Sequence, residues 1–147
     1  MKKYLSLILL AMAGLNVNAL ELPDIIGQDM MLQQRTKAKL WGWVQPKSDV
    51  TVDVSWNNVS YTTKADNDGR WNIYVDTPQA SYETQTVTIK GDGETVRLSN
   101  VLIGEVWVCA GQSNMEMPMK GFKGQPVEGA TEALLECGDS LLRLFTV

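Results

Sequence analysis

Hydrophobic and polar residues alternate along much of the chain between residue 20 and about residue 100. The alternation is clearest in Val50-Thr51-Val52-Asp53-Val54 and in Val87-Thr88-Ile89. Successive side chains on a strand point to opposite faces, so this pattern predicts strands with one buried face. Turn-forming residues such as Asp66-Asn67-Asp68-Gly69 separate the strands. The predicted strands span residues 30–32, 38–44, 50–56, 59–64, 71–75, 84–90 and 94–101.

Short strands at this regular spacing predict an all-β, antiparallel sandwich over residues 20–100. Four tryptophans fall within it, and two interpretations of them are open. Aromatic faces can form a platform on which sugar rings stack. A sandwich of this size also needs large side chains to fill its core, and Trp41 and Trp43 share one face of their strand. Core packing is the favoured interpretation for each of Trp41, Trp43, Trp56 and Trp71.

The pattern changes at residues 101–118, where an apolar run rich in β-branched residues begins at Val101 and resumes at residues 106–110. Such a run predicts a strand buried on both faces, as in a parallel sheet. It stops at Gly111, which allows a sharp turn, and a polar tripeptide follows. In open α/β sheets ligands bind at the carboxyl ends of strands. Ser113 is therefore a candidate nucleophile, with Gln112 and Asn114 beside it.

Residues after Pro118 predict a loop, then a helix from Pro126 to Cys137 ended by Gly138, then a strand over residues 141–147. Strand, helix and strand form the first β-α-β unit of a parallel sheet. We therefore expect a mixed fold, in which residues 20–100 form the β-sandwich and residues 101–147 begin an α/β domain. Ser140 follows the helix and precedes the strand, so we interpret Asp139-Ser140 as a turn.

Residues 1–19 have the pattern of a secretory signal peptide. Lys2 and Lys3 precede an apolar stretch, residues 5–15, that is too short to span a bilayer, and small residues allow cleavage after Ala19. A buried N-terminal helix is the alternative. The signal predicts export to the periplasm or the extracellular space, without a membrane anchor after cleavage.

Charge and composition exclude several classes of function. The chain has 13 basic and 17 acidic residues, a net charge of −4, and no cluster of Lys or Arg, which argues against a nucleic-acid partner. It has no histidine, which argues against a zinc site, and we expect no metal or cofactor. Cys109 and Cys137 can form one disulfide after export or remain buried free thiols, and the sequence leaves both open.

Residues 104–118, GEVWVCAGQSNMEMP, resemble the opening block of the SGNH hydrolases in the version of the sialate O-acetylesterase family. In that family a strand ends in G-[ED]-V-W-x-C-[AS]-G-Q-S-N-M-E-M-P. The β region is also similar to the N-terminal domain of the family in four short motifs. These are Leu22-Pro23, residues 29–33 (DMMLQ), residues 41–43 (WGW) and residues 68–71 (DGRW).

The resemblance implies a flavodoxin-like hydrolase domain in which Ser113 is the acyl-accepting nucleophile. The backbone N–H of Ser113 would contribute to the oxyanion hole, with Gly111, Gln112 and Asn114 in the vicinity of the substrate and oxyanion. The implied substrate is O-acetylated sialic acid or another acetylated glycan. The tetrapeptide Gly138-Asp139-Ser140-Leu141 has the sequence after which another branch of the SGNH hydrolases is named. In that branch the tetrapeptide ends an apolar strand, whereas here it follows the predicted helix, so we do not interpret Ser140 as the nucleophile.

A serine nucleophile needs a base, which is normally a histidine oriented by a carboxylate. In the resembling family a glycine, an asparagine and a distal aspartate–histidine pair come from later blocks, and this chain has no histidine. We therefore expect a truncated, N-terminal portion of an exported serine esterase that is inactive alone. The alternative is a non-catalytic β-sandwich that binds carbohydrate or serves as an accessory module.

Overall fold

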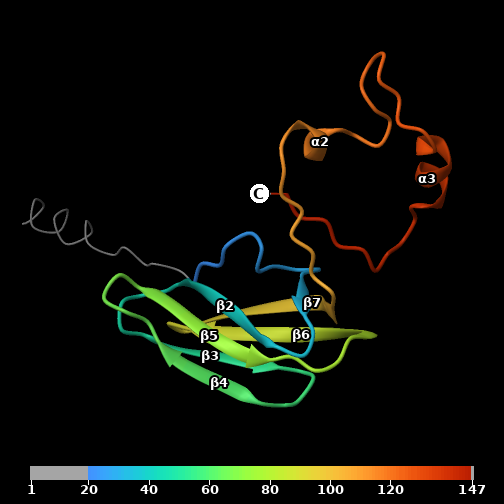
Figure 1. The fold of residues 1–147 in the computed structure, drawn as a ribbon. Helices are drawn as coiled ribbons and strands as arrows, with labels where there is room; N and C mark the ends of the chain where they lie inside the picture. Colours follow the sequence, from blue (N-terminus) through green and yellow to red (C-terminus); the bar gives the residue numbers. More distant parts are fainter. Residues whose placement is uncertain (1–19, 147) are drawn as a thin grey trace, which may run out of the picture.

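The computed structural model describes residues 20–146, apart from the side chain of Asn114, so the expected signal peptide at residues 1–19 lies outside the described residues. Within this range, strands come first and two short helices follow (Figure 1). No helix of the described part is long and apolar enough to cross a membrane. The elements are β1 (Met31–Gln33), β2 (Lys37–Trp43), β3 (Asp49–Val54), β4 (Ser60–Lys64), β5 (Arg70–Asp76), β6 (Ser81–Gly91), β7 (Glu94–Gly104), α2 (Ser113–Glu116) and α3 (Ala130–Glu136).

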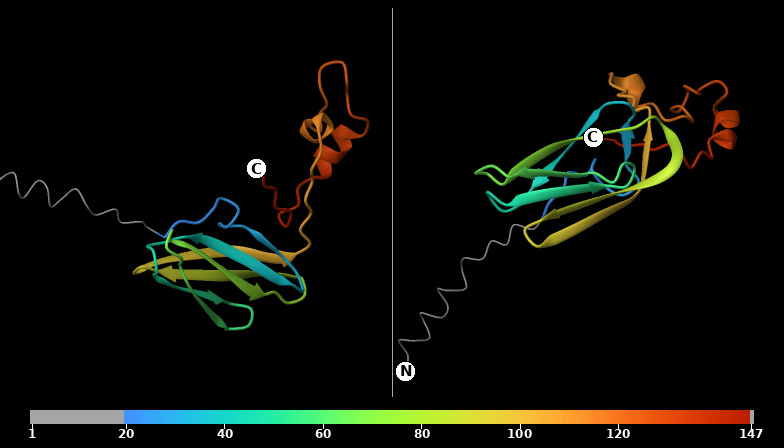
Figure 2. Two further views of the ribbon diagram at one scale, coloured as in Figure 1. Left: turned by 60° about the vertical axis from the view of Figure 1, so that its left-hand side comes forward. Right: turned by 90° about the horizontal axis from the view of Figure 1, so that it is seen from below.

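The strands form two sheets that enclose one hydrophobic core (Figures 1 and 2). The larger sheet has the strand order β1-β7-β6-β3-β4, and the smaller one pairs β2 with β5. Neighbouring strands run antiparallel except β1 and β7, which are parallel with Met31 opposite Leu102. The expectation of a wholly antiparallel arrangement is therefore wrong at this pair, because β1 and β7 are separated in the chain by β2–β6 and are not joined by a hairpin.

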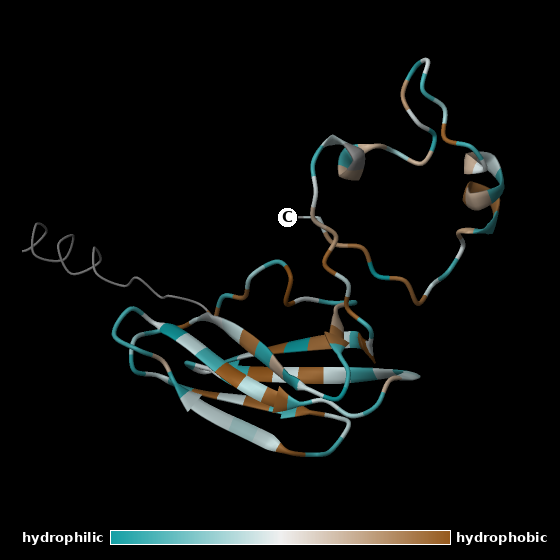
Figure 3. Cartoon of the chain, viewed as in Figure 1, coloured by the Kyte–Doolittle hydropathy of each residue, from teal (hydrophilic) through white to brown (hydrophobic). Residues whose placement is uncertain are grey.

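The core explains why alternation predicted the strands well. Val52 of β3 lies opposite Ile89 of β6, and both side chains are fully buried. Leu40 and Val75 of the smaller sheet belong to the same cluster. Burying each such side chain contributes roughly 1.5–3 kcal/mol, so the apolar residues determine which face of each strand is directed toward the core. Figure 3 shows the resulting alternation of hydrophobic and hydrophilic positions along the strands. All seven predicted strands are confirmed, with ends that differ by a few residues.

The tryptophans divide between two environments. Trp71 is a core residue, 2% exposed, and the half-buried Trp56 packs against the core and donates its indole N–H to the carbonyl of Asp76 at 2.8 Å. Trp41 and Trp43 do share a strand face, but it is the face opposite the buried Leu40. The prediction of core packing is therefore wrong for Trp43, whereas Trp41 is half-buried at the edge of the core.

The expected β-α-β unit does not form in residues 105–146. Strand β7 continues to Gly104, so the boundary expected between residues 100 and 101 lies inside it. Residues 106–110 are exposed and extended without a strand partner, residues 141–146 form no strand, and α3 buries no residue. A strand that is buried on both faces needs hydrogen-bonded neighbours and cover on both sides, and the described residues supply neither here. Figures 1 and 2 show this segment extending from the end of β7 away from the two sheets.

Candidate active site

Ser113 is the first residue of the single-turn helix α2, which follows the extended segment after β7. The turn is closed by the amide N–H of Met115, which donates to the carbonyl of Gln112 at 2.9 Å. The Ser113 side chain is exposed. The sequence predicted that this serine projects from the carboxyl end of a buried strand, whereas here it begins a one-turn helix after an unpaired segment.

Space, rather than backbone conformation, favours glycine at position 111. A Cβ added at Gly111 would lie 2.5 Å from Cγ of Met115, a distance that real Cβ contacts essentially never show. Its φ is not positive, unlike that of Gly121 or Gly129. The sequence-based reason, a sharp turn that only glycine allows, is therefore replaced by the close approach of the Met115 side chain.

The predicted neighbours of Ser113 do not form a catalytic array in this structure. Gln112 is the N-cap residue of α2, but its exposed side chain makes no capping hydrogen bond. Within the described part of the chain, no side chain bonds to the Ser113 hydroxyl, and the side chain of Asn114 is not described. The sequence contains no histidine that could act as a base. The same residues contain no group of three His, Cys, Asp or Glu side chains that could hold a metal ion.

Glu105 is an exposed residue whose hydrogen bonds the sequence does not reveal. Its carboxylate accepts hydrogen bonds from Gln33 Nε2 at 3.0 Å and from Gln34 Nε2 at 2.6 Å. These bonds from Gln33 and then Gln34 hold the pKa of Glu105 below its usual value. The amide N–H of Val106 also donates to Gln33 Oε1 at 2.8 Å. Together the two glutamines fix the direction in which the chain leaves β7 toward Ser113.

Thr77 forms hydrogen bonds with the backbone of the segment that contains these glutamines. Its buried hydroxyl lies 2.7 Å from the Gln33 carbonyl and 2.9 Å from the Thr36 carbonyl, either of which can accept its proton. It also accepts from the Thr36 amide N–H at 3.1 Å. Gln34 Oε1 accepts from the Ala80 amide N–H at 2.8 Å. The DMMLQ motif and its following glutamine therefore connect the β-domain to the segment that carries Ser113.

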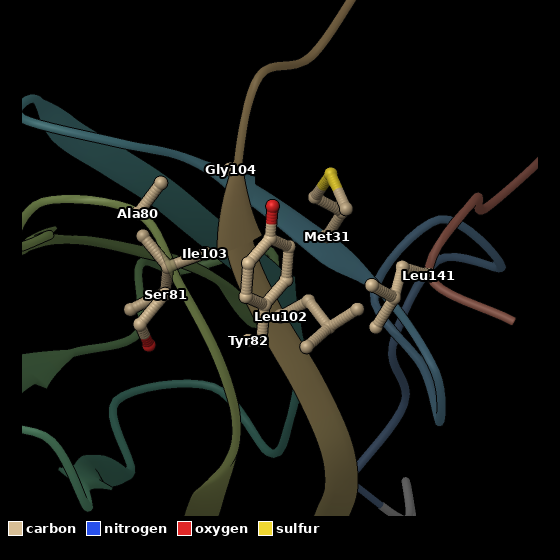
Figure 4. Close-up of a pocket in the computed structure, with 8 residues that line it drawn as sticks. All are labelled: Met31, Ala80, Ser81, Tyr82, Leu102, Ile103, Gly104 and Leu141. Atoms are coloured by element: carbon tan, nitrogen blue, oxygen red, sulfur yellow. The ribbon is translucent and has the colours of Figure 1, made fainter.

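A small apolar pocket of about 230 Å³ lies at the exit of β7, and Ser113 does not line it (Figure 4). Met31, Tyr82, Ile103 and Leu141 contribute to its walls. In Figure 4 Leu141 comes from the C-terminal segment, whereas the other three belong to the larger sheet. The pocket therefore lies between the larger sheet and the C-terminal segment, and Ser81 also lines it.

The two cysteines and Ser140 occupy exposed positions. Cys109 and Cys137 are both free thiols, so the prediction that they would be buried is wrong, and no disulfide joins them. The Leu141 amide N–H donates to Asp139 Oδ1 at 2.8 Å, which is the bond of an Asx turn. This contact supports the interpretation of Asp139-Ser140 as a turn.

Comparison with curated proteins finds sialate O-acetylesterases. The human and orangutan (Pongo abelii) proteins are each 34% identical over 101 residues, which is 63% of this chain. The mouse protein is 31% identical over 96 residues. The chain is a relative of the sialate O-acetylesterases. It spans only 19% of the length of the human and orangutan proteins, which fits a match to an N-terminal portion. No protein-family model matches the chain.

Comparison with solved structures agrees with this relationship. A carbohydrate acetylesterase from Xanthomonas citri superimposes with a TM-score of 0.70 and 26% sequence identity. The match covers 82% of this chain and 26% of that protein. The mostly β fold is therefore close to part of a known carbohydrate acetylesterase. At family level, the relatives are esterases that act on acetylated carbohydrate.

Proposed function

We propose that these residues are the N-terminal part of an exported serine esterase that removes O-acetyl groups from sialic acid or related glycans. The observation that carries the proposal is the unbroken GEVWVCAGQSNMEMP block, within a chain related to sialate O-acetylesterases. The exposed position of Ser113 at the start of α2 supports it, because a nucleophile must be reachable by substrate. Export is proposed from the signal-like pattern of residues 1–19.

The proposed reaction is acyl transfer in two steps. Ser113 Oγ attacks the carbonyl carbon of the acetyl ester while a base removes the hydroxyl proton. The tetrahedral intermediate then expels the sugar oxygen, which takes up the proton, and the acetyl group stays on Ser113. Water next attacks this acetyl-enzyme, releases acetate and restores the serine. Backbone N–H donors, including that of Ser113, would stabilise the oxyanion.

The base is proposed to lie in polypeptide beyond these 147 residues, because the present sequence has no histidine. The β-domain and the Gln33–Gln34–Glu105 contacts then serve to hold the Ser113 segment at the edge of a catalytic domain. By this proposal, the 147 residues alone hydrolyse acetyl esters no faster than a serine without a catalytic base does.

The test uses the longest open reading frame that contains this sequence, expressed as one secreted protein. Hydrolysis of 4-nitrophenyl acetate and of 9-O-acetyl-N-acetylneuraminic acid is measured for the wild type and two serine variants. We expect Ser113→Ala to lower kcat by about 10³-fold or more, since it removes the nucleophile. Ser140→Ala is the matched control, because Ser140 lies in an exposed turn, and its kcat should stay unchanged. Full activity in Ser113→Ala would overturn the assignment of the nucleophile.

A further inference from the structure

The outward face of the smaller sheet gathers aromatic and cationic side chains. In β2 the residues facing the core are Leu40 and Gly42, and in β5 they are Trp71, Ile73 and Val75. Because side chains alternate, the residues between them point outward. We call this surface the β2–β5 outer face, and its central residues are Lys39, Trp41, Trp43, Arg70, Asn72 and Tyr74.

The antiparallel register arranges these six side chains as three cross-strand pairs. Lys39 lies opposite Tyr74, Trp41 opposite Asn72, and Trp43 opposite Arg70. Directly opposite side chains in an antiparallel pair have Cβ atoms roughly 5 Å apart. Successive pairs on the same face are separated by roughly 7 Å along the strands. The resulting patch is long enough for two linked sugar rings.

The aromatic groups of this face are available to a ligand. Trp43 is 38% exposed and Tyr74 is 52% exposed, on adjacent strands of the same sheet. Lys39 Nζ lies 5.9 Å from the ring centroid of the half-buried Trp41, which favours a fixed ring orientation. A pyranose ring has an apolar C–H face and hydroxyl groups at its rim, so it matches a flat aromatic ring bordered by polar groups. Asn72, with donors and an acceptor, lies between the two aromatic positions on β5's side of the patch.

The charges of the central pairs favour an anionic ligand. Lys39 and Arg70 are cations, and the three pairs contain no carboxylate. Within the described residues neither cation takes part in an ion pair; the two ion pairs found there join Lys64 to Asp49 and Lys90 to Asp53. Carboxylates flank both ends of the face: Glu21 pairs with Trp43, Asp66 accepts a hydrogen bond from the Arg70 amide N–H at 2.8 Å, and Asp76 lies opposite Lys37. The six central residues therefore carry a net positive charge, in a protein whose net charge is −4.

We propose that the β2–β5 outer face is a binding site for an acidic glycan. One sugar ring stacks on Trp43, and its carboxylate pairs with the neighbouring Arg70, whose planar guanidinium forms paired hydrogen bonds to carboxylates. A second, linked ring stacks on Tyr74, two cross-strand pairs away. Lys39 supplies a second positive charge. The site is separate from Ser113 and does not depend on the proposed esterase activity, because it lies entirely within the β-domain.

The first experiment titrates the purified, ¹⁵N-labelled protein with 3′-sialyllactose and, separately, with neutral lactose. We expect saturable shifts of the indole N–H signals of Trp41 and Trp43 with sialyllactose, whereas those of Trp71 and Trp107 stay in place. Lactose should bind at least threefold more weakly. This measurement needs no variant. The proposal is overturned if no indole signal shifts, or if lactose binds as tightly as sialyllactose.

The second experiment compares variants by calorimetric titration with 3′-sialyllactose. Trp43→Ala should weaken binding at least tenfold, and Arg70→Gln at least threefold with no change for lactose. Trp107→Ala is the matched control, since Trp107 is an exposed tryptophan outside the sheets, and it should bind as the wild type does. Sedimentation velocity tests whether a second copy covers the face instead. A dimer that Trp43→Ala dissociates would overturn the glycan proposal, as would unchanged affinity in Trp43→Ala.

Discussion

Gln34 Nε2 donates a hydrogen bond to the Glu105 carboxylate at 2.6 Å, and this bond joins the residue directly after β1 to the residue directly after β7. The two strands are parallel neighbours, so their carboxyl ends meet at one edge of the larger sheet. Gln33 reinforces the junction through bonds to Glu105 and to Val106. The segment that leads to Ser113 therefore leaves the β-domain at a fixed point.

Protonation of Glu105 should loosen this junction. The pKa of Glu105 is lowered in the folded protein by hydrogen bonds from Gln33 and Gln34. The ionised carboxylate therefore stabilises the fold at pH values above 4.5, the ordinary pKa of a glutamate. That stabilisation is lost as the pH falls through the lowered pKa. We expect Glu105→Gln to have a lower Tm than the wild type near neutral pH, and the difference to vanish in acid. Thermal unfolding followed by circular dichroism across this pH range checks it.

Asp53→Asn is the control for this pH dependence. The pKa of Asp53 is also lowered, by hydrogen bonds from Lys90 and then Ser60, but Asp53 lies on β3, away from the junction. Both variants should lose their Tm difference from the wild type in acid. Only Glu105→Gln should accelerate hydrogen exchange at the Val106 amide. Equal acceleration in both variants, or in neither, would show that Glu105 does not order the segment.

Removing the Thr77 hydroxyl should destabilise the fold. Thr77→Val keeps the shape of the side chain but leaves the Thr36 amide N–H and the Gln33 carbonyl without this buried partner. An unsatisfied buried polar group costs about 1–3 kcal/mol, so we expect a loss of that order in the free energy of unfolding. Urea denaturation measures it. Thr77→Ser retains the hydroxyl and should lose clearly less; equal losses would assign the effect to packing alone.

A side chain at Gly111 should distort α2. In Gly111→Ala the new Cβ would meet Cγ of Met115, so the backbone chemical shifts of residues 113–116 should move away from helical values. The double variant Gly111→Ala, Met115→Ala removes Cγ and should restore them. Gly138→Ala is the control, because nothing lies within 4 Å of a Cβ added there and its φ is not positive. Helical shifts in the single variant would contradict the close-contact explanation.

Both cysteines should react without unfolding. Cys109 and Cys137 are exposed free thiols, so iodoacetamide should add two carbamidomethyl groups to the native protein. Intact mass spectrometry before and after reduction counts them. A protein that accepts no label until it is reduced would contain the disulfide that the sequence had left open.

Local patterns determine the β-domain, and so the sequence predicted it closely. In β3 and β6 the alternation of Val52 and Ile89 with polar neighbours was sufficient, because burial of one face decides the strand. The face itself could not be assigned for Trp41 and Trp43. Both sides of β2 carry apolar residues, and only the packing of the second sheet against the first shows that Leu40 faces the core.

Non-local contacts determine the rest, and the sequence did not reveal them. The apolar run at residues 106–110 predicted a buried strand, yet strand formation requires neighbouring strands that the described residues do not provide. The hydrogen bonds of Glu105 were not predicted, because its partners, Gln33 and Gln34, lie about 70 residues earlier in the chain. A carboxylate and two adjacent amides carry no local signature of such a contact.

Covalent labelling tests the central proposal, that Ser113 is the acyl-accepting nucleophile, most directly. The complete secreted protein that contains these residues is treated with a fluorophosphonate, which bonds to activated serines, and its peptides are sequenced by mass spectrometry. We predict a single adduct on Ser113, together with loss of acetylesterase activity in proportion to labelling. An adduct on Ser140 or another serine of an active enzyme, with Ser113 unmodified, would contradict the account.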